Sequence, residues 1–264
     1  MTDSYYHYHP HYDQHHRQLV SESCASECPD PRLDVSGYEG PFKSLTKCYI
    51  NGNCTSDYDK ISCWNTAGIT DMSSAFYNID QFDDKLECWN VSQVKNMARM
   101  FDGAYNFNKP INSWNVSQVT DMEGMFDGAE YFDVPIDSWN VSQVKNMAHM
   151  FDSAFNFNKP INSWNVSQVT DMEDMFDGAY YFNTAINSWN VSQVTDMGYM
   201  FAGEIYFNKP IDSWNVSKVE NMEGMFDGAF YFNQPIDSWD ISQVEDMEEM
   251  FNSARDFNQC LSTW

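Results

Sequence analysis

The 264 residues carry 42% hydrophobic and 16% aromatic side chains, which is enough apolar material for a folded core and excludes wholesale disorder. Against 39 acidic residues stand only 14 basic ones, a formal charge of −25, so the surface repels nucleic-acid phosphates and anionic lipids. No apolar run reaches the ~20 residues of a membrane-spanning helix, and no membrane insertion is expected.

Residues 1–21 form a tail rich in His and Tyr that lacks the apolar stretch of a secretory signal peptide. Its polarity predicts disorder, while its histidines also leave open an affinity for transition metals. The tract consists of His7, His9, His11, His15 and His16.

Residues 22–63 are expected to form a cap over one end of the core, because they hold five of the seven cysteines together with Gly and Pro. Two disulfides among four of them, in any of three pairings, or a zinc site with C-x₃-C spacing would serve this purpose. The four are Cys24, Cys28, Cys48 and Cys54. Asn53, in an N-C-T sequence, is the most credible glycosylation acceptor.

Residues 64–264 repeat with a period of 25, which is typical of a solenoid whose units bury their apolar sides against each other. Each repeat begins with Trp, which is taken here as position 1, and eight complete repeats follow without insertion or deletion. The tryptophans are Trp64, Trp89, Trp114, Trp139, Trp164, Trp189, Trp214, Trp239 and Trp264.

Within a repeat, the pattern I-x-x-W-x-V, as in Ile111, Trp114 and Val116, predicts a short strand with Trp and Val inward. Apolar residues at positions 6, 9, 12, 13, 16 and 19 predict a helical or 3₁₀ segment with one buried face. A polar turn such as FNKPI closes the unit. The expected fold class is an α/β repeat solenoid, leucine-rich-repeat-like, with one parallel strand and one helical turn per repeat.

Two outward columns are candidate binding surfaces. Position 2, in the N-V-S sequence, carries Asn90, Asn115, Asn140, Asn165, Asn190 and Asn215. These side chains either stabilise the solenoid or form a flat binding face. Positions 17 and 18 carry Tyr105, Tyr131, Tyr180, Tyr181, Tyr206 and Tyr231. This row is either partly buried at the edge of the core or exposed and suited to protein or glycan contacts.

Cys63 and Cys88 each precede a repeat Trp, and therefore lie in one column on adjacent turns of the solenoid. A Cα separation of ~5 Å is within disulfide range, so this pair is predicted to be bonded. Cys260 is left over.

The block 89–138 matches 139–188 at most positions, which indicates duplication of a two-repeat unit. His149 occupies variable position 11 and is expected to be merely exposed. Asp recurs at positions 8 and 14, but no calcium-binding loop sequence occurs, and position 8 suits helix capping. No metal site and no cofactor are predicted.

The phrase WNVSQVTDMEGMFDGAEYF, at residues 114–132, resembles the bacterial surface-protein repeat that is grouped with BspA-like leucine-rich-repeat proteins. The resemblance covers residues 64–264. It implies a cell-surface or extracellular location and a role in adhesion or protein binding, and it carries no catalytic residues. The Cys- and His-containing N-terminal region is not part of the family pattern.

Columns of like groups do not provide the unlike, converging groups that an active site requires, so an enzyme is not expected. The sequence favours a non-enzymatic binding or adhesion solenoid that recognises a protein or glycan. The alternative is a structural scaffold that self-associates through the C-terminal end, because the array stops at Trp264, the first residue of a ninth repeat.

Overall fold

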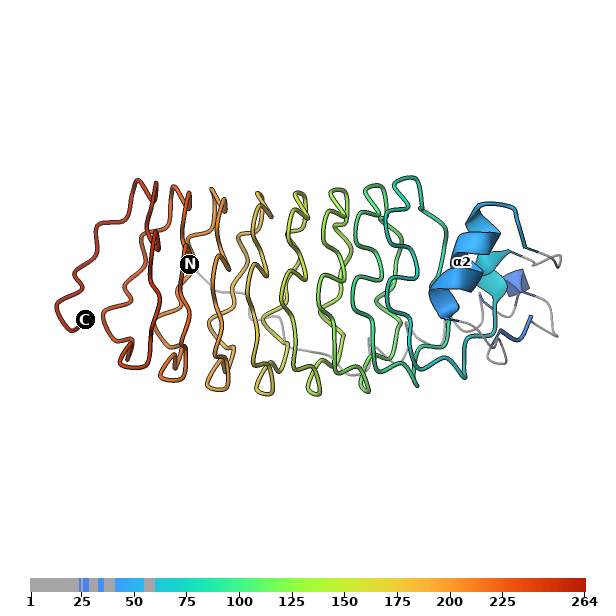
Figure 1. Ribbon diagram of the computed structural model, residues 1–264, viewed down its shortest axis with the longest axis horizontal. Helices are drawn as coiled ribbons and strands as arrows, with labels where there is room; N and C mark the ends of the chain where they lie inside the picture. Colours follow the sequence, from blue (N-terminus) through green and yellow to red (C-terminus); the bar gives the residue numbers. More distant parts are fainter. Residues whose placement is uncertain (1–23, 25, 29–32, 36–40, 55–59) are drawn as a thin grey trace, which may run out of the picture.

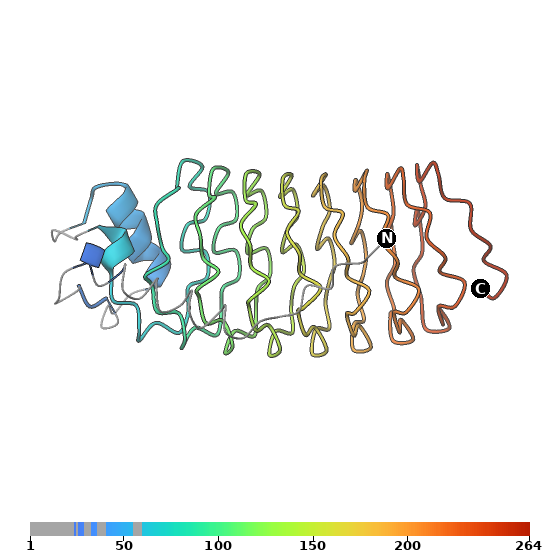
Figure 2. The ribbon, with the colours of Figure 1, turned by 180° about the vertical axis from the view of Figure 1, so that it is seen from behind.

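The computed structural model describes residues 24, 26–28, 33–35, 41–54 and 60–264. Figure 1 shows an elongated body in which the 25-residue units stack as successive coils along the long axis. Helix α2 covers the end at which the array begins, and the C-terminus lies at the other, as the reverse view in Figure 2 also shows. The predicted tail, residues 1–21, lies outside the described residues.

The cap is built on α2, Phe42–Ile50, followed by the 3₁₀ helix η1, Ile61–Cys63. The buried face of α2 presents Phe42 edge-on to Trp64 and Trp89, with ring centroids 6.3 and 5.5 Å apart. Gly52, at φ +65°, ends the helix with the paired backbone hydrogen bonds of a left-handed C-terminal cap. The apolar face of α2 thus closes one end of the core.

The coils are joined by backbone hydrogen bonds that run along the solenoid axis. Alternate residues donate to the next coil: Met97 N to Asp121 O at 3.0 Å, Phe101 N to Met125 O at 2.9 Å, and so on through positions 9 to 15. Single parallel bridges at position 8 link every coil to the next, from Asp71–Asn96 to Asn221–Asp246. Within residues 60–264 these bridges take the place of multi-residue strands.

Positions 9 to 16 form consecutive turns rather than the predicted helical segment. Met100 N donates to Met97 O and Ala104 N to Phe101 O, and the residues inside these turns at positions 11 and 15 have positive φ, 55° at Arg99 and 66° at Gly103. Such turns return to the same face every three or four residues, so their apolar spacing resembles that of a helix. The parallel pairing lies at position 8, and not at the I-x-x-W-x-V stretch where a strand was expected.

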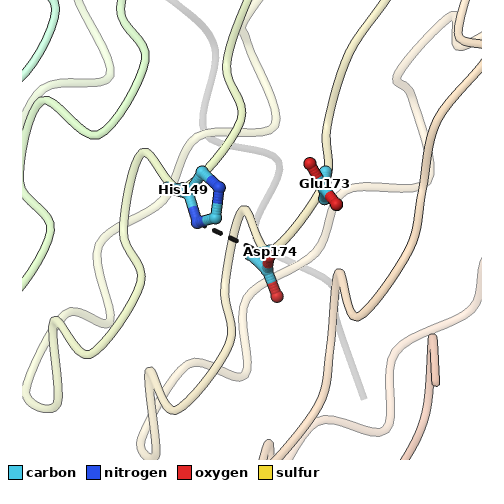
Figure 3. Close-up of side chains that lie close together, drawn as sticks. All are labelled: His149, Glu173 and Asp174. Atoms are coloured by element: carbon cyan, nitrogen blue, oxygen red, sulfur yellow. Dashed lines mark ion pairs between the residues drawn. The ribbon is translucent and has the colours of Figure 1, made fainter. Parts of the chain in front are cut away.

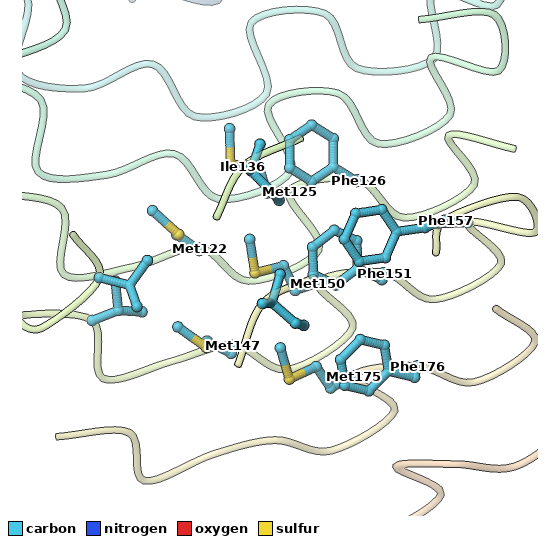
Figure 4. Packing of buried hydrophobic residues seen from close by; sticks show 14 of the residues in the cluster. Met122, Met125, Phe126, Ile136, Met147, Met150, Phe151, Phe157, Met175 and Phe176 are labelled. Carbon is cyan, nitrogen blue, oxygen red and sulfur yellow. The ribbon is translucent and has the colours of Figure 1, made fainter. Parts of the chain in front are cut away.

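The core consists of side-chain ladders along the axis. Trp, Val, Met, Phe and Ile at the predicted inward positions of the inner coils are almost fully buried, which confirms those expectations. Figure 4 shows Met and Phe from successive coils stacked in rows; Phe126 lies 5.7 Å from Phe151, between ring centroids. Each repeat Trp from Trp89 onwards donates Nε1–H to the backbone carbonyl 28 residues before it, as Trp114 does to Leu86 O at 3.0 Å.

Three disulfides secure the cap: Cys24–Cys88, Cys28–Cys63 and Cys48–Cys54. The predicted Cys63–Cys88 bond is therefore wrong, although the two residues do lie on adjacent coils. Cys28 N donates to Cys24 O, so Cys24 and Cys28 are one helical turn apart. The ~5.4 Å pitch of a helical turn is close to the spacing between coils. Cys24 and Cys28 can therefore each bond to one cysteine of the position-25 column, Cys88 and Cys63 respectively. The zinc alternative also falls, because all four of its cysteines are in disulfides.

Candidate functional site

The six Asn at position 2 are exposed, but their side chains are used locally. Asn115 Oδ1 accepts the backbone N–H of Ser117 at 3.2 Å, and the same turn recurs at the other five, with Asp240 and Ser242 in the last coil. This is the bond by which Asn or Asp stabilises a turn two residues ahead. The Asn column is therefore part of the fold, and only its amide groups face solvent.

A second Asx column, at position 20, connects the coils, and the sequence analysis did not identify it. Asn183 N donates to Asn158 Oδ1 at 3.1 Å, and Asn208 N to Asn183 Oδ1 at 3.2 Å. All eight repeats carry Asp or Asn at position 20, and this restriction to two residue types could have identified the column from the sequence. The eight are Asp83, Asn108, Asp133, Asn158, Asn183, Asn208, Asn233 and Asn258.

The tyrosines of positions 17 and 18 gather on one side of the coils. Tyr105, Tyr131, Tyr181, Tyr206 and Tyr231 are exposed by 38–49%, and Tyr180 is half-buried. The structure thus brings all six predicted tyrosines into ring contacts. We call the continuous run of Phe155, Tyr180, Tyr181, Tyr206 and Tyr231 the aromatic strip; Tyr105 and Tyr131 form a separate pair.

Ring geometry within the aromatic strip is close. Phe155 stacks on Tyr180 at 4.8 Å between centroids, Tyr181 lies parallel to Tyr206 at 6.0 Å, and Tyr206 lies 5.8 Å from Tyr231. In the separate pair, Tyr105 meets Tyr131 edge-on at 5.2 Å. These separations are in the range in which aromatic pairs attract each other, so the exposed rings are held as a surface rather than left as independent side chains.

The backbone keeps the strip in register. Tyr181 N donates to Phe155 O at 3.2 Å, and Tyr231 N to Ile205 O at 3.2 Å, so position 18 of one coil is bonded to position 17 of the coil before it. A hydrogen bond to Tyr180 raises the pKa of Tyr206, and one to Glu130 raises the pKa of Tyr105. Tyr105 and Tyr206 therefore stay neutral at physiological pH.

Asn53, the predicted glycosylation acceptor, is exposed just after α2 and beside the Cys48–Cys54 disulfide. Cys260 is a free, exposed thiol in the last coil. Across the part of the chain that the structure describes, no helix is long and apolar enough to span a membrane.

Comparison with known proteins places the repeats in a family. A family model described as a Mycoplasma protein of unknown function, DUF285, matches residues 43–163 and again 150–264. No curated protein and no solved structure matches the chain.

Proposed function

Since the chain belongs to the DUF285 family, which is described without a function, we propose that it is a non-enzymatic binding solenoid that recognises a protein or glycan ligand. The observation that carries this proposal is the exposed aromatic strip. Rigid Tyr rings combine a large apolar face with a polar tip and are enriched where proteins contact their partners. The flat C–H faces of sugar rings pack on the same kind of surface.

We further propose that the protein acts at a cell surface or outside the cell. Three disulfides support this location, because such bonds persist in oxidising compartments. The resemblance of the repeat to that of BspA-like surface proteins points the same way.

The regularity of the array also favours binding over catalysis. Its columns repeat like groups at every coil, and binding through many weak equivalent contacts suits such a surface better than catalysis does. The alternative, a scaffold that self-associates through the C-terminal end, would appear in analytical ultracentrifugation as concentration-dependent growth.

The proposal is tested with beads coated with the full chain and offered to a panel of glycans, extracellular proteins and intact cells. We expect saturable adhesion to at least one member of the panel. Periodate treatment of the target abolishes adhesion if the ligand is a glycan, and protease treatment does so if it is a protein. Beads that adhere no better than beads coated with an unrelated acidic protein would contradict the proposal.

A further inference from the structure

Position 11 follows a rule in two of the coils. Its side chain lies over the next coil and pairs with Glu at position 10 there: Arg99 Nη2 with Glu123 Oε1 at 2.8 Å, and Tyr199 OH with Glu223 Oε1 at 2.5 Å. In both cases position 11 of the next coil is Gly. A Cβ at Gly124 would lie 3.2 Å from Arg99 Cγ, and one at Gly224 only 2.2 Å from Tyr199 Cε1. The long side chain at position 11 therefore requires a glycine at position 11 of the next coil, because a Cβ there would crowd it.

His149 breaks this rule. The next coil carries Asp174 at position 11 where the other two carry Gly, and Glu173 remains at position 10. His149 Nδ1 lies 3.5 Å from Asp174 Oδ2 and 3.5 Å from Asp152 Oδ2. Figure 3 shows the imidazole facing Asp174, with Glu173 beside it. One ligand atom from each of His149, Glu173 and Asp174 lies within 4.8 Å of the others.

The duplicated blocks provide an internal comparison. Residues 99 and 124 are Arg and Gly, whereas their counterparts 149 and 174 are His and Asp. The first copy thus holds a permanent guanidinium against Glu123. The second copy lacks that cation, has the carboxylate of Asp174 in place of Gly124, and keeps Glu173 at position 10. A neighbouring column, at position 14, adds Asp127, Asp152 and Asp177 on successive coils.

The carboxyl groups around this site affect each other's ionisation. Burial, and then the neighbouring Asp152, raise the pKa of Asp127 and Asp177 to about 7. Burial also lowers the pKa of His149, but Asp174, Asp152 and Glu173 outweigh it and leave that pKa above its ordinary value. A bound cation would relieve this repulsion as Arg99 does in the first copy.

We propose that His149, Glu173 and Asp174 form a binding site for one divalent transition-metal ion of the Zn²⁺ class, with Asp152 available as a fourth ligand. An imidazole with carboxylates suits Zn²⁺ and its neighbours, whereas Ca²⁺ and Mg²⁺ prefer oxygen alone. Ligands at ~2.1 Å from an ion lie about 3.5 Å apart, so small side-chain rotations close the site. The ion would clamp the coil 139–163 to the coil 164–188.

The test uses Zn²⁺ and a full-length parent in which the five tract histidines, His7, His9, His11, His15 and His16, are replaced by Ala. His149 is then its only histidine, so the imidazole signals in a ¹H–¹⁵N spectrum report on this residue alone. We expect a shift that saturates at one equivalent of Zn²⁺, no such shift with Ca²⁺ or Mg²⁺, and a Zn²⁺-dependent rise in melting temperature.

The chain supplies its own matched control. The double variant His149→Arg/Asp174→Gly recreates the pair at residues 99 and 124, so it should fold and should bind Zn²⁺ at least about tenfold more weakly by calorimetry. Conversely, Arg99→His/Gly124→Asp should add a second equivalent. Aspartate fits there because Gly124 has φ +55° and Asp174 already adopts 52°.

Three results would overturn the proposal. They are a His149 signal that does not respond to Zn²⁺, unchanged calorimetric affinity in the His149→Arg/Asp174→Gly protein, and a folded Arg99→His/Gly124→Asp protein without a second equivalent.

Discussion

Glu204 is the residue at which the repeat departs most from its own rule. Position 16 is Ala in six of the eight repeats and Ile79 in the first, but Glu204 in the coil 189–213. Its side chain is fully buried, and neither carboxyl oxygen has a hydrogen-bond partner among the described residues. Burial, with a smaller effect of Asp177, raises its pKa well above the ordinary value. Burial therefore favours the protonated, uncharged form of this carboxyl.

This residue predicts a pH dependence of stability. Because the folded-state pKa is raised, the folded chain binds more protons than the unfolded chain above pH ~4.3, and the free energy of unfolding falls as pH rises from there. Glu204→Ala should remove this decline and stabilise the protein at neutral pH by roughly 1–3 kcal/mol. Denaturant melts at several pH values measure it.

The control for that prediction is Glu248→Ala, which removes a carboxyl group from an exposed side chain in the last coil. It should leave stability nearly unchanged at every pH. Equal effects of the two substitutions would show that net charge, and not the burial of Glu204, determines the pH profile.

At the scale of the element, the inward residues of each coil could be predicted from the sequence, but the backbone that carries them could not. Met122, Met125, Phe126 and Ala129 have helical spacing and are all buried. The chain nevertheless makes successive turns, because positions 11 and 15 adopt positive φ. Glycine at position 15, as in Gly128, Gly178 and Gly228, is consistent with a positive φ there. Two repeats carry Ser153 and Ser253 at this position with the same conformation, so the sequence did not show a consistent glycine pattern.

The tryptophan ladder predicts a large cost for a small change. Trp164→Phe should lower the free energy of unfolding by roughly 2–4 kcal/mol, because it leaves a void and deprives the Ile136 carbonyl of its donor at 3.1 Å. Trp264 makes the same bond to Ile236 but is only partly buried. Trp264→Phe, compared by urea denaturation, should cost clearly less, and equal costs would refute the role of burial.

The cap predicts a specific pattern of free thiols. Cys88→Ser should free Cys24, and Cys63→Ser should free Cys28, because these are the bonded pairs. Alkylation without reduction, followed by mass spectrometry, identifies the freed cysteine. A peptide linking Cys63 to Cys88 in the unmodified protein would contradict the pairing. The sequence placed both in one column but did not show that Cys24 and Cys28 would lie against it.

At the scale of the whole molecule, repetition predicted an elongated body and outward columns, and the structure bears out the burial and exposure pattern. The sequence did not show which tyrosines touch. Positions 17 and 18 alternate in identity from coil to coil, and contact depends on the offset of one position between neighbouring coils. Tyr131 of one coil therefore meets Tyr105 of the previous coil, and Tyr181 meets Phe155.

The measurement that tests the central claim most directly is the adhesion of coated beads carrying Tyr181→Ser/Tyr206→Ser/Tyr231→Ser. Tyr77→Ser is the matched control, because Tyr77 is 45% exposed at position 14 and lies outside the strip. If the aromatic strip binds the ligand, the triple variant should lose affinity by about tenfold or more while the control retains it. A folded triple variant that adheres like the wild type would contradict the account.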